Sequence, residues 1–412
     1  MKATRFSLYV FVIALVCSGV RAQEPLRKLV EFPDPVGPER RFSGGRQAAL
    51  SDDGTKMIVA FYGSRAQLYD LSKNAPIGEP LGTSGDGEVG FVTNRVAYTA
   101  DWGSMRLWDT QTGALIGQPI PHELREDTII DPAISPNGKF IATRNAMKSF
   151  ALRDVNSHKP IFQSEAGESV VYSLSFSRDN KLLFARSGRS LVVHGTQTGQ
   201  RVAGPFFNVR SFYYEPRQKI FLTISQADKF ESELRFYDTQ ADQWSETQRT
   251  KVSGRFRRLR ALDNDRILIQ LSNADYTVSM IRMSLSDPAT QQAIEPAVTR
   301  AFDLELAGDK QYWVTTGIVG VSCQKFGKPQ PVWQAGYRGV GHKLRLHQLG
   351  NDRILVHLPS EGVTCYALRD GSKLWHLDEA RSVSVFGDKV IVCHSSGVQV
   401  WQAAKSNDEN PL

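Results

Sequence analysis

A short sequence pattern recurs nine times along this chain of 412 residues. Each copy has a polar turn, then a basic residue, then a run of apolar and β-branched residues. The basic residues that mark the copies are Lys56, Arg95, Lys139, Lys181, Lys219, Arg266, Lys310, Arg353 and Lys389. Neighbouring markers lie 36 to 47 positions apart, with a mean of about 42. This spacing is typical of repeated units of four β-strands.

The order of residues inside each copy predicts four short strands. A strand with alternating residues precedes the turn, as in Ser173–Ser177, and the apolar run after the turn forms the second strand. The third strand ends in an aromatic and an acidic residue, such as Trp108-Asp109, and a short fourth strand follows another polar turn. Short strands at regular spacing indicate an all-β protein, and we find no sustained helical periodicity.

One such unit has two apolar faces that it cannot bury alone, so the units are expected to stack radially around an axis. We therefore predict an all-β fold with a single closed β-propeller of four-stranded blades. We count nine units, whereas propellers typically have about four to eight blades. Eight blades plus one displaced unit is the alternative, and the unit over residues 256–296 is the least regular.

The ends of the chain predict how the ring closes. The last unit supplies three strands, over residues 383–386, 390–393 and 398–401, and it lacks a fourth. The segment Leu26–Phe32 is otherwise unassigned and can supply that strand. Joining the two ends in one blade removes an exposed sheet edge that would invite aggregation.

The first 22 residues are typical of a secretory signal peptide. Lys2 and Arg5 precede the apolar run Phe6–Val16, and Ala22 ends a small-residue cleavage site. We expect bacterial export to the periplasm or the medium, a propeller over residues 23–403 and a polar tail over 404–412. Cleavage would lower the net charge from +7 to +4, so no nucleic acid partner is expected. No later stretch is apolar enough for a membrane helix, so we expect no integral membrane segment in the mature chain.

The cysteines and histidines match no metal or catalytic motif. Without Cys17 three cysteines remain (Cys323, Cys365 and Cys393), and we expect buried thiols because an odd number cannot form a disulfide framework. Five histidines fall in the last two units: His342, His347, His357, His376 and His394. Their spacing fits no standard ligand pattern, and no nucleophile elbow or phosphate-binding loop is present. We predict no metal site, no cofactor and no catalytic residue.

Residues 48–250 resemble degenerate WD40 repeats of the kind found in exported bacterial proteins. The best copy runs from Tyr98–Asp101 to Met105–Asp109, and Ala133–Lys139 matches the family's strand–turn motif. The resemblance implies a buried hydrogen-bond network, for which Thr99, Asp101 and Trp108 could supply three of the four members. The family's Gly-His pair is absent before this blade.

The more divergent units over residues 256–403 are similar to quinoprotein-like (PQQ-like) propeller repeats. Gly362–Leu368 and Asp370–Trp375 carry this similarity. The adjacent cysteine pair of the quinoprotein enzymes is absent, so the resemblance implies no quinone cofactor.

A propeller's loops at one end of the ring are its usual binding surface. The resemblance places Tyr62, Trp102, Arg144 and Arg186 there, in the turns between second and third strands, and exposed aromatic and arginine residues often anchor protein interfaces. The basic run Arg255–Arg260 could bind an acidic partner or an anionic polysaccharide, or could simply be a solvated face.

Our main hypothesis is an exported, non-catalytic scaffold that binds a protein or peptide through its loop rim. The alternative is a propeller enzyme, either lactonase-like or a glycan-acting hydrolase or lyase, with carboxylates and histidines from several blades at the channel mouth. Carbohydrate binding on exposed aromatic residues is a third reading that the sequence does not separate from the first.

Overall fold

A computed structural model describes residues 26–33, 45–61, 65–82, 88–101, 104–121, 132–144, 149–164, 171–188, 190–240, 244–275, 277–299, 303–317, 320–328, 330–337 and 344–403. The predicted signal peptide and polar tail lie outside these ranges. Every regular element in them is a β-strand, and none of their residues forms a helix long and apolar enough to cross a membrane.

The strands group into nine blades. Blades 1 to 3 contain β2 (Gly45–Leu50), β3 (Lys56–Phe61), β4 (Arg65–Asp70), β5 (Ala75–Gly82); β6 (Glu88–Thr93), β7 (Val96–Ala100), β8 (Ser104–Asp109), β9 (Leu115–Pro121); and β10 (Ala133–Ile134), β11 (Phe140–Arg144), β12 (Phe150–Asp154), β13 (Pro160–Gln163). Blades 4 to 6 contain β14 (Val171–Phe176), β15 (Leu182–Ser187), β16 (Ser190–Gly195), β17 (Arg201–Phe207); β18 (Val209–Glu215), β19 (Ile220–Asp228), β20 (Glu231–Asp238), β21 (Ser245–Ser253); and β22 (Arg255–Ala261), β23 (Arg266–Ser272), β24 (Thr277–Ser284), β25 (Gln291–Thr299). Blades 7 to 9 contain β26 (Asp303–Ala307), β27 (Tyr312–Gly317), β28 (Gly320–Lys325), β29 (Pro331–Gly336); β30 (Arg345–Leu349), β31 (Arg353–Leu358), β32 (Gly362–Ala367), β33 (Lys373–Leu377); and β34 (Ser382–Phe386), β35 (Lys389–Cys393), β36 (Gly397–Gln402), β1 (Arg27–Pro33).

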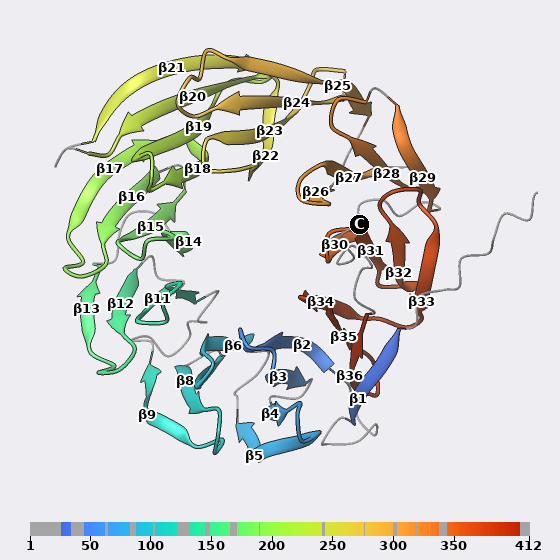
Figure 1. Ribbon diagram of the computed structural model, residues 1–412. Coiled ribbons are helices and arrows are strands. Elements are labelled where there is room, and N and C mark those ends of the chain that lie inside the picture. Colours follow the sequence, from blue (N-terminus) through green and yellow to red (C-terminus); the bar gives the residue numbers. More distant parts are fainter. Residues whose placement is uncertain are drawn as a thin grey trace, which may run out of the picture.

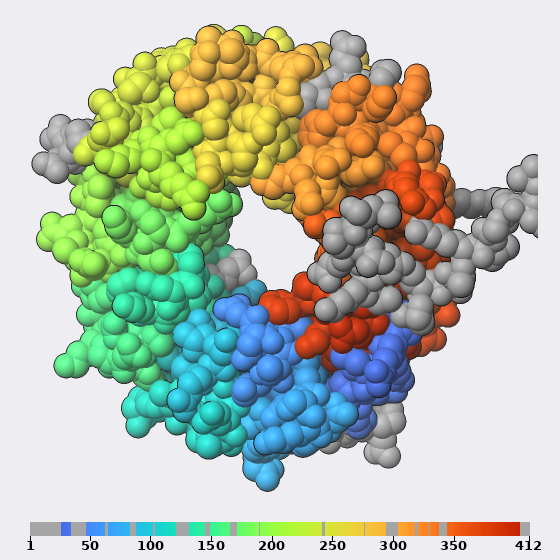
Figure 2. Space-filling model, in the orientation of Figure 1, coloured from blue at the N-terminus to red at the C-terminus, as the bar shows by residue number. Residues whose placement is uncertain are grey.

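The described residues form nine four-stranded antiparallel sheets arranged in a ring, with the first strand of each blade nearest the centre (Figure 1). This confirms the β-propeller and the count of nine blades rather than eight. The segment that looked least regular, over residues 256–296, is an ordinary blade of β22–β25. A ring of nine blades leaves an open centre, which is visible in the space-filling view (Figure 2).

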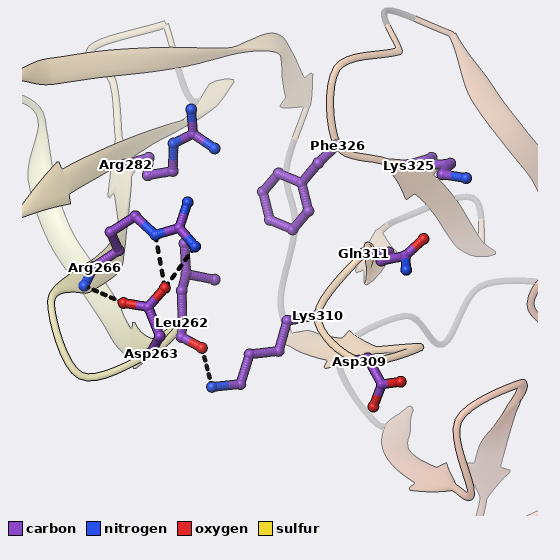
Figure 3. A pocket seen from close by; sticks show the side chains of 9 residues that line it. All are labelled: Leu262, Asp263, Arg266, Arg282, Asp309, Lys310, Gln311, Lys325 and Phe326. Carbon is purple, nitrogen blue, oxygen red and sulfur yellow. Dashed lines mark hydrogen bonds and ion pairs between the residues drawn. The ribbon is translucent and has the colours of Figure 1, made fainter.

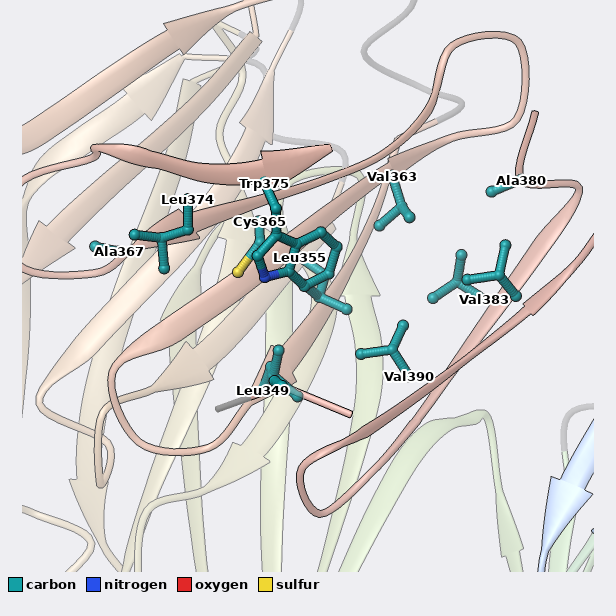
Figure 4. Packing of buried hydrophobic residues seen from close by; sticks show 12 residues of the cluster. Leu349, Leu355, Val363, Cys365, Ala367, Leu374, Trp375, Ala380, Val383 and Val390 are labelled. Carbon is teal, nitrogen blue, oxygen red and sulfur yellow. The ribbon is translucent and has the colours of Figure 1, made fainter. Parts of the chain in front are cut away.

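Burial changes from the centre of each blade outward. The second strands are almost wholly buried, as in β31, because neighbouring blades cover both of their faces. The outermost strands are largely exposed, as in β21. Between blades 8 and 9, Leu355 and Cys365 pack with Val383 and Val390 in one apolar cluster (Figure 4). We call the interface between two neighbouring blades a seam. Each seam thus has its own apolar core, and apolar burial across the seams holds the ring together.

The turn between the first and second strands has a repeated hydrogen-bond design. In blade 1 the Ser51 hydroxyl donates to Asp53 at 2.7 Å and accepts from the Lys56 amide at 3.0 Å. Ser135 makes the equivalent bonds in blade 3, and Ser177 makes them in blade 4. The polar turn of the sequence pattern therefore acts through the local bonds that Ser and Asp side chains make with their own backbone.

The same turns also bond to the turns of neighbouring blades. In four pairs of adjacent blades a side-chain oxygen of one turn accepts a hydrogen bond from the other turn. The bonds run from Asp53 N to Asn94 (3.3 Å), Asn137 N to Asn180 (2.8 Å), the Gln218 side chain to Asp265 (3.2 Å) and the Asn351 side chain to Asp309 (3.1 Å). The turn residues thus join neighbouring blades in addition to making their local bonds.

The ring closes as the sequence predicted. β1 pairs antiparallel with β36, with Phe32 opposite Val398. The Phe32 side chain is 4% exposed, and its ring centroid lies 3.9 Å from that of Tyr69 in blade 1. One strand therefore completes blade 9 and packs against blade 1.

The three cysteines among the described residues are buried thiols that form no disulfide, as expected. Burial raises the pKa of Cys323 to about 12, so this thiol stays protonated and unreactive near neutral pH.

The closing strand gives a first prediction. Phe32→Ala removes a buried aromatic ring from the seam between blades 9 and 1, and such truncations cost about 3–5 kcal/mol. We expect a clear fall in the thermal unfolding midpoint, measured by circular dichroism. Phe207→Ala is the matched control because Phe207 is 68% exposed. Equal midpoints for the two variants would contradict the closure role of Phe32.

Asp265 gives a second prediction. Burial raises its pKa, but bonds from the Ser286 amide and from Ser284 and Gln218 outweigh burial and bring the pKa down to about 2. A lowered pKa means that the ionised carboxylate stabilises the fold above the unfolded value of 3.8, and that this contribution is lost as the pH falls from about 4 to about 2.

We expect Asp265→Asn to lower the unfolding midpoint at neutral pH and to lose less stability than the native chain between about pH 4 and pH 2. Asp52→Asn, at an exposed turn position of blade 1, is the control. Parallel pH profiles for native chain and Asp265→Asn would refute the assignment.

Candidate interaction face

The antiparallel order of each blade sends its connections to two opposite faces of the ring. One face carries the turns between second and third strands and the crossovers from one blade to the next; we call it the crossover face. The other carries the turns between first and second and between third and fourth strands; we call it the hairpin face. The turns in which the sequence analysis places its four predicted binding residues are of the kind that this crossover face carries.

The structure places two of those four residues, since Tyr62 and Trp102 lie outside the described ranges. Arg144 ends β11, is 8% exposed, and donates from Nη1 to the Val171 carbonyl at 2.9 Å. Arg186 is half-buried in β15 and donates from Nη1 to the Arg210 carbonyl at 2.9 Å. Both arginines therefore reach the first strand of the following blade. Contact of any of the four residues with a partner stays a prediction.

The carbonyls that these arginines bind lie at β-bulges. Four first strands have a register shift near their start, between Gly45 and Gln47, Val171 and Ser173, Val209 and Ser211, and Phe256 and Arg258. A bulge leaves one extra residue unpaired and re-aims its side chain. In blades 4, 5 and 6 the extra residues are Tyr172, Arg210 and Arg257, and all three are exposed.

An exposed phenylalanine lies on the same face. Phe207 ends β17, directly before the crossover residue Asn208, and is 68% exposed, while Tyr172 is 54% exposed. The crossover face of blades 4 to 6 thus presents two large aromatic side chains together with Arg210 and Arg257. We call these four residues the aromatic–arginine patch.

The basic run of the sequence divides into two parts in the structure. Arg255 and Arg257 are exposed, and Arg257 contacts the Ser272 hydroxyl at 3.5 Å. Arg258 donates to the Leu304 carbonyl at 3.0 Å, and Arg260 pairs with Glu305 at 3.6 Å, both across the seam to blade 7. Only the first part of the run is therefore directed away from the seam.

Sequence reasoning missed Tyr172, Phe207 and Arg210. The alternation of polar and apolar residues along one strand does not reveal a bulge. A bulge shifts the pairing with the neighbouring strand by one residue, and that pairing is not visible in the order of residue types. One signal was available: Val171-Tyr172-Ser173-Leu174 and Val209-Arg210-Ser211-Phe212 share the order Val, exposed residue, Ser, apolar residue.

The WD40-like residues of blade 2 form part of the implied network. The Trp108 indole donates to the Thr99 hydroxyl at 3.0 Å. Asp101 is buried, accepts from the Ser104 amide at 3.1 Å and forms an ion pair with Arg106 at 2.5 Å. Asp101 thus pairs with Arg106, whereas the WD40 resemblance implies a histidine partner for this carboxylate.

Two histidines of blade 8 have structural partners. His357 is 4% exposed and bonds the Ala380 carbonyl at 2.9 Å, and His376 contacts Thr364 at 2.7 Å and Asp378 at 3.1 Å. His342 lies outside the described residues. Within the described part of the chain, no three His, Cys, Asp or Glu side chains converge so as to hold a metal ion.

The closed ring of four-stranded sheets defines a nine-bladed β-propeller. No protein-family model matches the chain, and no curated protein sequence matches it. Solved structures do resemble it. BamB from Moraxella catarrhalis aligns over 92% of this chain and all of its own, with 13% identity and a TM-score of 0.55. The C-terminal WD40 domain of Sif2 aligns over 93% of this chain and 99% of its own, with 13% identity and a TM-score of 0.54.

The dihydro-heme d1 dehydrogenase NirN is also similar, over 73% of this chain and 67% of its own, with 15% identity and a TM-score of 0.51. At these identities the likenesses concern the fold alone, and a propeller fold hosts binding proteins and enzymes alike.

Ser232 supports the crossover that carries Arg255 and Arg257. It is fully buried, its hydroxyl donates to the Gly254 carbonyl at 2.9 Å, and it accepts from the Phe256 amide at 2.9 Å. Ser232→Ala leaves both backbone groups without this partner, at a cost of about 1–3 kcal/mol. We expect a lower urea midpoint and faster hydrogen exchange at Phe256. Unchanged exchange there would contradict the role of the serine, and Ser360→Ala, at an exposed turn of blade 8, is the control.

Proposed function

We propose that the chain is an exported, non-catalytic β-propeller with divergent WD40-type blades that binds a protein or peptide through its crossover face. The observation that carries the proposal is the aromatic–arginine patch, in which Tyr172 and Phe207 expose more than half of their surface. Large exposed aromatic side chains beside arginines are the residue types that supply most of the energy in protein interfaces.

Hydrogen bonds hold the backbone beneath the aromatic–arginine patch, which favours binding by a preformed surface. Arg144 and Arg186 fix the backbone at the bulges of the next blades, and Ser232 fixes the crossover into blade 6. A backbone that is already fixed loses little further conformational entropy when a partner docks. The similarity in fold to a WD40 domain and to BamB is consistent with a scaffold of this kind.

Export is part of the proposal and depends on the sequence of residues 1–22. The buried free thiols fit either an oxidising or a reducing compartment, because none of the three forms a disulfide in the structure. The propeller-enzyme alternative has no specific observation in its favour among the described residues.

The binding proposal can be tested with a displayed library of random peptides selected on the immobilised mature chain. Affinities of the enriched peptides are then measured by fluorescence anisotropy for the native chain and for Tyr172→Ala/Phe207→Ala/Arg210→Ala. Loss of three anchor side chains should weaken binding at least about tenfold.

The control variant is Leu115→Ala/Val202→Ala/Arg369→Ala, which removes three exposed side chains from the hairpin face. It should bind within about twofold of the native chain, since rim substitutions away from an interface are nearly neutral. Equal affinities for the two triple variants would overturn the proposed surface.

A further inference from the structure

A pocket of about 340 Å³ opens on the hairpin face, between blades 6 and 7 (Figure 3). It lies on the opposite face of the ring from the aromatic–arginine patch, and the proposed function does not use it. Its volume is at the lower end of the range for sites that hold small molecules.

The pocket lies where the apolar contact between blades 6 and 7 ends, short of the hairpin face. Its buried core consists of Leu268, Met280, Leu304, Leu306 and Trp313. Leu262 and Phe326 are the half-buried residues at its edge. The Phe326 ring stands edge-on to Trp313, with centroids 4.9 Å apart and an interplanar angle of 85°. The edge of the seam thus supplies the pocket with an apolar wall that contains a fixed aromatic ring.

Four cationic side chains surround this apolar wall. Arg266 begins β23 and Arg282 lies on β24; the pairing of Leu268 with Arg282 directs both arginines to the sheet face that packs on blade 7. Lys310, from the turn between β26 and β27, and Lys325, at the end of β28, come from blade 7. In Figure 3 the Phe326 ring lies between the arginines of blade 6 and Lys325 of blade 7.

Two carboxylates also line the pocket, and both have other partners. Asp263 holds Arg266 through contacts of 2.6 and 2.7 Å. Asp309 accepts a bond from Asn351 of blade 8 at 3.1 Å. Lys310 donates to the Leu262 carbonyl, which fixes it across the seam. Arg282 contacts the Gln292 side-chain oxygen, and Lys325 Nζ lies 5.5 Å from the centre of the Tyr312 ring. Among the described residues neither pairs with a carboxylate, and the four cations of the pocket lining outnumber its two carboxylates.

We propose that this pocket binds a small organic anion, with a flat apolar body against Phe326 and Leu262 and an acidic group held by Arg282 and Lys325. A guanidinium group from blade 6 and an ammonium group from blade 7 suit a carboxylate or sulfonate, because both can donate charge-assisted hydrogen bonds to its oxygens. An aromatic body adds ring packing on Phe326, in a geometry that Trp313 fixes.

The test uses two fluorescent probes on the folded mature chain. The anionic probe is 8-anilinonaphthalene-1-sulfonate, and the neutral probe is N-phenyl-1-naphthylamine, which has the same ring systems without the sulfonate. The anionic probe should bind saturably at one site, and added salt should weaken its binding. Arg282→Gln/Lys325→Gln should weaken it at least about tenfold and leave the neutral probe unaffected.

The matched control is Arg178→Gln/Lys181→Gln, which removes one arginine and one lysine from an exposed hairpin turn of blade 4. It should leave anionic binding within about twofold of the native value. Thermal melts verify that both variants fold. Equal weakening in the two variants, non-saturable binding, or equal affinity for the neutral probe would each overturn the proposal. None of these results depends on whether a peptide binds the crossover face.

Discussion

The pairing of β1 with β36 is the constraint on which the rest of the structure depends. Every other blade is built from consecutive strands, so each could form wherever its own segment is complete. Blade 9 alone takes strands from both ends of the propeller. With Phe32 against Tyr69, the same strand also completes the seam to blade 1. Closure therefore gives all nine blades a neighbour on each side, and every apolar face is covered.

The two faces of the closed ring carry different kinds of side chains. On the crossover face, bulged first strands and inter-blade arginine bonds present Tyr172 and Arg210 to solvent. On the hairpin face, Ser and Asp turns bond to one another from blade to blade, and the seam at Phe326 ends in a cationic pocket. Binding at one of the two proposed surfaces would therefore leave the other accessible, because the sheets lie between them.

The sequence predicted the architecture well because each blade is specified locally. The marker spacing gave nine blades, and the segment Leu26–Phe32 gave the closing strand within one residue at each end. The sites were less predictable because they depend on contacts between blades. The bulge at Tyr172 is a property of strand register, and the bond from Arg186 to the Arg210 carbonyl joins residues 24 positions apart. The pocket at Phe326 likewise arises from how far one seam extends.

The closing pair also sets an order of events during biosynthesis. Phe32 and its partner Val398 lie near opposite ends of the propeller sequence. The strand that is synthesised first can therefore pair only after the last strand has been synthesised. Until then, β36 lacks its outer neighbour and blade 1 lacks one apolar cover, and such unpaired edges promote association between chains. Closing so long a loop is entropically costly and slow compared with forming a single blade. A chain that has completed its eighth blade but not its ninth therefore still exposes a strand edge and an apolar face through which chains can associate.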